Sequence, residues 1–280
     1  NATELEYQKN QTERNVIQLT IAYPNALKKE VNVYPHQKVG FQRLVEVWNK
    51  GRRGFLLADD MGLGKTLQAL MLMTWVREKM NAGLIKSKPM LVVAPVALLK
   101  NWHDEYGRFF DTTIFGEPLE LHGTNLKLYK HINKLNLSLI SKESLVMTTY
   151  ETLRDYQLSF GRLEWSVIVL DEAQKIKPPS AMMTNATKAM KYDFGLCMTG
   201  TPVENSWVDL WSIVDFALPG KLGCVKDFNR KYQVPLSNKS ADIFKLGQEL
   251  KSEVDPYILR RLKEDNLKGL PEKHIYHCPV

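Results

Sequence analysis

The stretch FLLADDMGLGKT, residues 55–66, places two glycines, a lysine and a threonine shortly after an apolar run. A helix that begins at this point exposes main-chain N–H groups, and its dipole adds positive potential, so the turn favours a bound phosphate. Gly62 and Gly64 allow the main chain to curl around the phosphate oxygens. Lys65 is then placed to reach the β- and γ-phosphates, and Thr66 to ligate Mg²⁺. The stretch therefore predicts a nucleotide-binding phosphate loop.

Asp59 is the departure from this pattern, because an ordinary phosphate loop has a glycine at that position. The alternative interpretation is a glycine turn followed by a lysine that only starts a helix. An apolar run precedes the loop, and a helix-like stretch from Lys65 to about Met80 follows it. This strand-loop-helix context favours the phosphate loop.

Five short apolar runs, each followed by a helix-like stretch, indicate the fold class. They are residues 55–58, 90–94, 145–149, 166–171 and 194–200. Each run is apolar on both faces, which is typical of a buried parallel strand. Strands that alternate with helices predict an α/β fold with a doubly wound, mostly parallel sheet. Ligands of such sheets bind at the carboxyl ends of the strands, and polar residues follow all five runs.

The pattern changes after Pro219. Residues 220–265 are polar and helix-like, with basic pairs and the closing segment YILRRLKED. Each of these basic side chains either extends a positive surface or is simply solvated. We expect an N-terminal extension at 1–33, a nucleotide-binding lobe at 34–219 and a helical appendage at 220–280.

Composition narrows the class of protein. The 280 residues include 38 Lys and Arg against 31 acids, a net charge of +7, which indicates either a mildly basic protein or one that binds a polyanion such as nucleic acid. The sequence contains no run of 18 apolar residues, so we expect no membrane partner. Three widely spaced cysteines argue against a disulfide framework. In HIYHC, residues 274–278, alternating strand side chains are a better interpretation than a metal site, because no fourth ligand is near.

The segment VIVLDEAQ ends a predicted strand with Asp171 and Glu172. Phosphoryl transfer needs one carboxylate that holds hydrated Mg²⁺ and another that orients and deprotonates the attacking water. Asp171 suits the first role and Glu172 the second. Alone, the pair could equally cap a helix, but the phosphate loop favours the catalytic interpretation.

Six segments together resemble the first RecA-like lobe of SWI/SNF-family ATPases, a branch of the superfamily-two helicases. They are YPHQKVGFQRL (34–44), LLADDMGLGKTLQAL (56–70), LVVAPVALLKNWHDEYGRF (91–109), VMTTYETLRD (146–155), VIVLDEAQKIKPPSA (167–181) and MTGTPVENSWVDLWSIVDFALPG (198–220). The resemblance implies a RecA-like P-loop NTPase lobe that uses ATP and Mg²⁺ and translocates along double-stranded DNA. Aspartate at the position of Asp59 is common in this family.

The resemblance also assigns roles to single residues. Gln37 resembles the glutamine that reads the adenine edge, and Gln174 resembles the fourth residue of the acidic box. Thr199 and Thr201 resemble the segment that couples the ATP state to lobe movement, although a loop of Ser/Thr turns is the alternative. The expected nucleotide contacts are Gln37, Asp59, Met61, Gly62, Leu63, Gly64, Lys65, Thr66, Leu67 and Gln174.

The segments after the second and third runs resemble those that grip the DNA backbone. The expected contacts are Pro95, Lys100, Asn101, Thr149 and Tyr150, whose small polar groups suit phosphate oxygens and carry no sequence information. Trp102 lies at helical spacing from the leucines before it and is expected in the core rather than stacked on a base. RNA is the alternative nucleic-acid partner.

The resemblance further implies a second RecA-like lobe that supplies arginine fingers. We therefore expect the chain to be the ATP-binding half of a larger motor, nearly inactive alone. The alternatives are an ATP-gated scaffold that does not hydrolyse ATP and the motor subunit of a restriction or defence system. The compact lobe favours a prokaryotic source, hence a cytoplasmic, nucleoid-associated protein, over a nuclear one.

Overall fold

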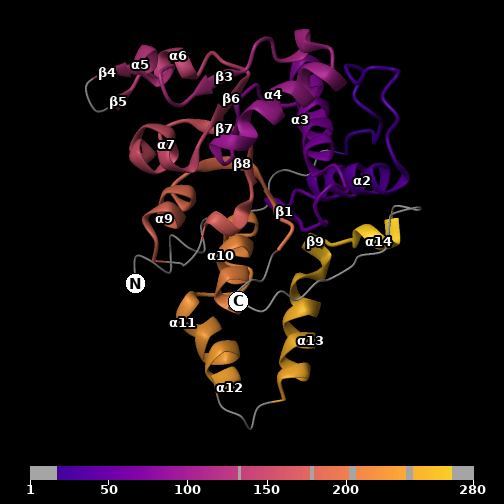
Figure 1. The fold of residues 1–280 in the computed structure, drawn as a ribbon, viewed down its shortest axis with the longest axis vertical. Coiled ribbons are helices and arrows are strands. Elements are labelled where there is room, and N and C mark those ends of the chain that lie inside the picture. Colours follow the sequence, from indigo (N-terminus) through magenta and orange to yellow (C-terminus); the bar gives the residue numbers. More distant parts are fainter. Residues whose placement is uncertain (1–17, 132–133, 177–179, 202–205, 238–241, 267–280) are drawn as a thin grey trace, which may run out of the picture.

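The computed structural model describes residues 18–131, 134–176, 180–201, 206–237 and 242–266. Within these residues, seven strands form one sheet in the order β3-β6-β2-β7-β8-β1-β9, and every neighbouring pair is parallel (Figure 1). The predicted doubly wound α/β class is confirmed, with a sheet that is wholly rather than mostly parallel.

The five predicted strands are present and two more join them. The seven are β1 (Gly54–Leu57), β2 (Met90–Val93), β3 (Leu119–Leu121), β6 (Leu145–Thr148), β7 (Glu164–Asp171), β8 (Lys191–Met198) and β9 (Ile258–Leu259). A separate antiparallel pair consists of β4 (Lys130–His131) and β5 (Lys134–Leu135).

The helices of the lobe and of the appendage follow the order of the chain. Those of the lobe are α2 (Pro35–Asn49), α3 (Lys65–Asn81), α4 (Val96–Phe109), α5 (Leu126–Tyr129), α6 (Leu137–Ile140), α7 (Tyr150–Asp155), α8 (Gln157–Phe160), α9 (Met182–Lys188) and α10 (Trp207–Ala217). Those of the appendage are α11 (Val225–Phe228), α12 (Val234–Ser237), α13 (Ile243–Val254) and α14 (Lys263–Asn266). Short helical turns are η1 (Thr112–Ile114), η2 (Ala173–Lys175), η3 (Asn229–Gln233) and η4 (Asp255–Tyr257).

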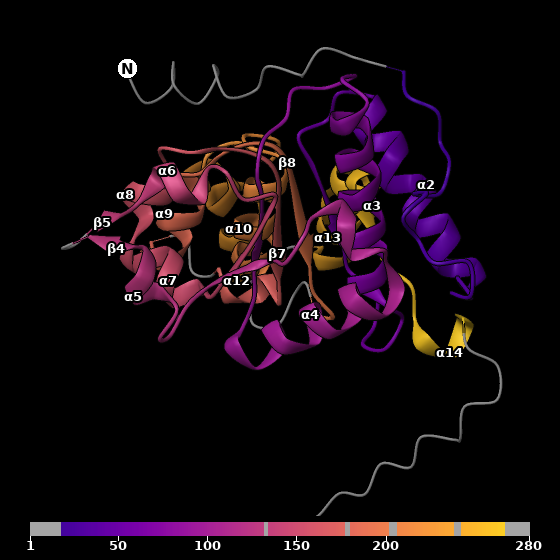
Figure 2. The same cartoon turned by 90° about the horizontal axis from the view of Figure 1, so that it is seen from above.

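Successive side chains of a strand point to opposite faces of the sheet. Both faces of this sheet are apolar, so helices cover both. On β7, Val167 and Val169 belong to one core cluster, whereas Ile168 and Leu170 belong to the other. Helices α2, α3 and α4 pack on the first face, and α7, α9 and α10 pack on the second (Figure 2). Because both faces of the sheet are buried, its strands are continuous apolar runs in the sequence.

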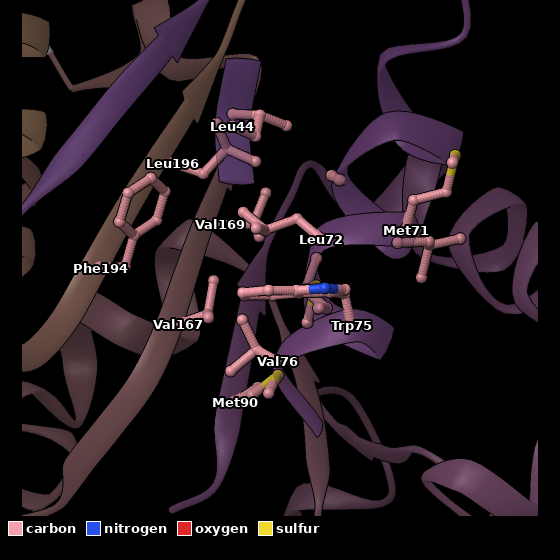
Figure 3. Packing of buried hydrophobic residues seen from close by; sticks show 14 of the residues in the cluster. Leu44, Met71, Leu72, Trp75, Val76, Met90, Val167, Val169, Phe194 and Leu196 are labelled. Carbon is pink, nitrogen blue, oxygen red and sulfur yellow. The ribbon is translucent and has the colours of Figure 1, made fainter. Parts of the chain in front are cut away.

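Helix α3 is the central element of the first layer. It is apolar on nearly all sides, with a continuous buried stretch from Leu67 to Val76, since the sheet, α2 and α4 surround it. Figure 3 shows Leu72 and Trp75 of this helix against Val167 and Val169 of β7. The phosphate loop that precedes α3 is thus joined to a helix that is buried over most of its length.

The segment before α2 is part of the lobe where the structure describes it. Leu19 and Val33 are buried in the first core cluster. Asn49 ties the segment down, since its side chain accepts from the Leu19 N–H at 3.3 Å and donates to the Leu19 carbonyl at 2.7 Å. The extension predicted at 1–33 therefore contributes core residues over its described part, 18–33.

The appendage differs from expectation at its end. Helices α11, α12 and α13 extend away from the sheet, and the chain then returns to the sheet (Figure 1). Leu56 pairs with Ile258 and Leu57 with Leu259, so β9 forms the edge next to β1. The prediction of a helical YILRRLKED was wrong for Ile258 and Leu259, because pairing with a distant strand overrides the local pattern.

Replacement of Leu72 by alanine tests the importance of the α3 layer. Leu72 is fully buried, so Leu72→Ala should lower the free energy of unfolding by about 2–5 kcal/mol through lost burial and a residual cavity. The matched control is Leu158→Ala on α8, where the side chain is 82% exposed and the expected change stays within about 0.5 kcal/mol. Denaturant titration followed by circular dichroism measures both, and equal losses would contradict the packing argument.

Candidate functional site

The turn from β1 to α3 has the geometry of an anion-binding loop. Gly62 and Gly64 have positive φ angles of 88° and 72°, and Gly64 is the N-cap of α3. A side chain would be strained in these left-handed conformations, which explains the two glycines. The helix begins at Lys65 and directs its free N–H groups into the loop. The predicted strand-loop-helix arrangement is therefore present.

Gln37 lies against this loop from α2. A Cβ atom on Gly64 would approach the Gln37 Nε2 to 2.2 Å, so the glycine also makes room for the glutamine. The Gln37 Oε1 accepts from the Tyr34 N–H at 3.0 Å, and its Nε2 donates to the Leu63 carbonyl at 3.4 Å. Adenine recognition by Gln37 stays a prediction, but the residue is positioned at the loop.

Burial separates the expected nucleotide contacts into two groups. Leu63 is fully buried, whereas Leu67 is 5% exposed and lines a cavity together with Tyr34 and Gln37. Met61 is 74% exposed at the outside of the loop, and Thr66 is half-buried in the first turn of α3.

Lys65 is the cation of the site. Its ammonium group donates to the Asp59 carbonyl at 2.6 Å and to the Asp60 carbonyl at 3.2 Å. Burial lowers the pKa of Lys65, while the carboxylates of Glu172, Asp59, Asp171 and Asp60 act in the opposite direction. Phosphate loop and acidic pair are therefore electrostatically one site, as expected.

Asp59, at the position of the usual glycine, is fully buried and paired. The Arg261 Nε donates to its Oδ1 at 2.9 Å, and the Arg261 Nη2 donates to its Oδ2. The interpretation of the 260–263 basic residues as surface side chains is thus wrong for Arg261, whose side chain is only 13% exposed. A buried acid needs such a partner, since an unpaired buried charge is costly.

The acidic pair lies at the carboxyl end of β7, at the same edge of the sheet: Asp171 is the last residue of the strand and Glu172 follows it. Glu172 has a φ of 52°, a left-handed conformation that is uncommon without glycine and is found at functional sites. Burial raises the pKa of Asp171, and the neighbouring Glu172 carboxylate raises it further, while a hydrogen bond from Trp102 lowers it. Because Glu172 is in the left-handed conformation, the backbone turns sharply after Asp171. The Asp171 carboxylate accepts from Trp102, whereas the Glu172 carboxylate accepts from Gln174.

Two buried side chains from the predicted DNA-binding segments support Asp171. The indole Nε1 of Trp102, on α4, donates to the Asp171 Oδ2 at 2.8 Å. The hydroxyl of Tyr150, on α7, donates to the Asp171 carbonyl at 2.8 Å. Trp102 lies in the core as predicted, but its bond to the acid was missed, because the sequence does not indicate which buried groups meet.

A hydrogen-bonded chain joins the acidic pair to the segment after β8. The Gln174 Nε2 donates to the Glu172 Oε2 at 2.6 Å, and the Thr199 hydroxyl donates to the Gln174 Oε1 at 2.7 Å. The Thr201 N–H donates to the Thr199 hydroxyl oxygen at 3.0 Å. The structure therefore brings together Glu172, Gln174, Thr199 and Thr201; the coupling role of the threonines stays a prediction.

The donor set fits a magnesium-bound triphosphate. A lysine, a helix N-terminus and a glycine-lined loop face two carboxylates, which is the combination that holds phosphate and a hard cation. Thr66 and Asp171 would hold Mg²⁺, in part through water. No group of three or more metal-binding side chains occurs in the described part of the chain, and residues 274–278 lie outside it.

The expected DNA contacts differ in accessibility. Lys100 and Asn101 are exposed on α4, which begins directly after Pro95. Thr149 is 6% exposed and caps α7, and its hydroxyl accepts from the Thr152 N–H at 3.1 Å. The Tyr150 side chain is buried, so its expected contact is corrected to the main chain at most.

Comparison with known proteins identifies the family. The model of the SNF2-related domain matches residues 36–280. The chain belongs to the SNF2-related family. Its RecA-like α/β fold agrees with the resemblance found in the sequence.

Individual relatives agree with this assignment. The chain is 40% identical to the Zorya protein ZorD of Escherichia coli, and the match covers 89% of this chain and 24% of that protein. It is 30% identical to the ISWI chromatin-remodeling complex ATPase CHR11 of Arabidopsis thaliana over 90% of this chain and 22% of that protein. The chain thus spans about a quarter of the length of these relatives.

A solved structure shows the same fold. The Sulfolobus solfataricus SWI2/SNF2 ATPase core in complex with dsDNA has a TM-score of 0.74 and 32% identity, and the match covers 90% of this chain and 49% of that one. Across the described residues, no helix has the length and apolar character that a membrane crossing requires.

Trp102→Phe tests the support of Asp171. Mg²⁺ would bind the ionised carboxylate of Asp171, so Mg²⁺-dependent nucleotide binding should be lost as the pH falls through the pKa of Asp171. The substitution removes a bond that lowers this pKa, so the loss should occur at a higher pH in the variant than in the wild type. The control is Trp165→Phe. The buried Trp165 indole donates to the Phe160 carbonyl at 3.2 Å and makes no hydrogen bond to Asp171 or Glu172. Fluorescent-nucleotide titrations across pH decide, and identical profiles for both variants would reject this role.

Proposed function

We propose that the chain is the ATP-binding half of an ATP-dependent double-stranded-DNA translocase, which hydrolyses ATP with Mg²⁺ when a second RecA-like lobe is present. The observation that carries this proposal is the convergence of Lys65, Glu172 and Thr199 at the carboxyl ends of β1, β7 and β8. A site that only bound nucleotide would not need a hydrogen-bonded path from the acidic pair to the next loop.

Each residue would perform a separate part of the reaction. Bound Mg²⁺ would neutralise phosphate charge in the transition state. Lys65 would move its ammonium group from the loop carbonyls to the phosphates. Glu172 would accept a proton from the attacking water at Oε1, since its Oε2 already accepts from Gln174 at 2.6 Å. Gln174 would thereby report the state of Glu172 to Thr199.

DNA would bind along the neighbouring part of the same edge. Strand β2 lies beside β7, and β6 lies beside β2. Helix α4 follows β2 and carries the exposed Lys100 and Asn101, and α7 follows β6. The same two helices hold Asp171 through Trp102 and Tyr150. A DNA backbone that shifts α4 or α7 would therefore alter the acid that binds Mg²⁺, which is a route for DNA-stimulated hydrolysis.

A second lobe completes the proposal. In-line phosphoryl transfer gains its largest acceleration from arginine side chains supplied across a cleft, so the isolated chain of residues 1–280 should bind ATP weakly and turn over almost none. DNA rather than RNA is supported by the dsDNA complex of the related archaeal core. A motor of a restriction or defence system remains the second candidate, and an accompanying nuclease domain would distinguish it.

The higher identity to a bacterial protein, 40% against 30% for a plant remodelling ATPase, favours a bacterial cytoplasmic, nucleoid-associated location over a nuclear one. The presence of Glu172 speaks against a scaffold that does not hydrolyse ATP.

Glu172→Gln tests the proposed general base in the two-lobe protein. The amide cannot accept the proton, so DNA-stimulated ATP turnover should fall by about 10²-fold or more while ATP affinity is retained. Glu143→Gln, a half-buried glutamate before β6 and outside the site, should leave turnover unchanged. Phosphate-release kinetics and nucleotide binding measure the two effects. Unchanged turnover in Glu172→Gln would remove this residue from the mechanism.

Lys100→Ala tests the proposed DNA surface. Binding to duplex DNA should weaken equally for unrelated sequences, and the slope of log affinity against log salt should decrease by about 1, since one phosphate contact is lost. Lys142→Ala removes an exposed lysine before β6, at the opposite edge of the sheet, and should keep the slope. Fluorescence anisotropy at several salt concentrations compares the two; equal slopes would place the DNA elsewhere.

A further inference from the structure

We propose that Arg261 is a positioning residue for the phosphate loop, and that the segment at 258–263 controls ATP affinity through it. This inference rests on the ATP site of the proposed function and adds a residue that lies 202 positions after the loop residue it holds. Its basis is a buried network that joins three elements of the lobe to the segment that follows α13 of the appendage.

The first observation is the network itself. The Arg261 guanidinium binds both carboxylate oxygens of Asp59, and its Nη2 also donates to the Gln68 Oε1 at 2.9 Å. Its Nη1 donates to the His36 carbonyl on α2. A planar fork that binds a carboxylate with two parallel bonds restricts orientation as well as distance. Arg261 therefore fixes the start of the loop relative to α2 and α3.

The second observation is that main-chain pairing continues from β9 into the loop. The Ala58 N–H donates to the Leu259 carbonyl at 2.7 Å, and the Asp60 N–H donates to the Arg261 carbonyl at 3.0 Å. The Lys263 N–H donates to the Asp60 Oδ2 at 3.1 Å. The first residues of the phosphate loop are therefore held as an edge of the sheet by residues 259–263.

The third observation connects this network to the phosphates. Arg261 binds the carboxylate of Asp59, and the main-chain carbonyl of Asp59 accepts from the Lys65 ammonium at 2.6 Å. Gln68, the other side chain held by Arg261, donates to the Gly64 carbonyl at 3.3 Å. A shift of residues 258–263 would move the Asp59 carbonyl, which accepts from Lys65, and the Gly64 carbonyl, which precedes Lys65 in the chain. It would also leave the buried Asp59 carboxylate unpaired. ATP affinity should therefore depend on this segment and, by linkage, ATP should hold the segment in place.

The test measures KM and kcat for ATP in the two-lobe protein with saturating DNA. Arg261→Lys keeps the charge and loses the fork, so KM should rise about tenfold while kcat stays within about twofold. The matched control is Arg260→Lys, whose side chain is exposed and whose KM should not change. Partial unfolding would lower kcat through the active fraction and leave KM unaltered, so the two causes separate.

A second variant covers the case in which a lone buried charge prevents folding. Asp59→Gly with Arg261→Ala removes both charges and restores the usual loop glycine, so the protein should fold with a KM that stays raised. A wild-type KM in Arg261→Lys or in the folded double variant would overturn the proposal. In that case the Asp59–Arg261 ion pair would only neutralise two buried charges and would not position the loop for ATP. A wild-type protein that binds no ATP would instead refute the proposed function.

Hydrogen exchange provides an independent readout. Addition of a nonhydrolysable ATP analogue to the wild-type two-lobe protein should slow exchange of the Lys263 amide, which donates to Asp60, at least severalfold. Exchange on α12 should not change. A bound analogue that leaves the Lys263 amide unaffected would overturn the coupling.

Discussion

The parallel pairing of β7, β8 and β1 is the constraint on which the candidate site depends. Met198 at the end of β8 pairs with Leu57 on one side and with Asp171 on the other, so three strands end at one level. The phosphate loop, the acidic pair and Thr199 therefore begin side by side, although they are distant in the sequence. A slip of one residue on β7 would turn Asp171 to the other face of the sheet and separate it from Trp102.

Asp171 is the point at which the two halves of this edge meet. Its carboxylate interacts electrostatically with Lys65 and Glu172 and accepts a hydrogen bond from the Trp102 indole of α4. Its main-chain carbonyl accepts from the Tyr150 hydroxyl of α7. Burial disfavours its charge, and Trp102 offsets part of that cost. The site therefore keeps an acid that is ready to bind a cation but sensitive to small movements of two helices. Such a poised group suits an enzyme whose nucleotide chemistry responds to a distant ligand.

Local patterns sufficed for the elements that carry their own signal. The runs that became β1 and β7 are apolar on both faces, and the strand before GLGKT and the helix after it favour a phosphate loop over a simple glycine turn. The edge strands β3 and β9 have three and two residues and exist through pairing with distant partners, so periodicity could not reveal them. The partners of Asp59 and Asp171 were missed for the same reason. One signal was available for Asp59, since an acid at the end of a buried strand requires a distant cation.

The choice of aspartate over glycine changes how the loop is built. A glycine-started phosphate loop is completed by local turns, whereas this loop depends on Arg261 and on the main chain of Leu259. Its first residues reach their final environment only when the chain has formed the appendage and returned to pair with β1. Contacts of such sequence separation form late and are entropically expensive, because the intervening loop must close first. The nucleotide site is thereby made conditional on the completed lobe, so a partly folded chain presents a loop that lacks its counter-charge and binds phosphate less well.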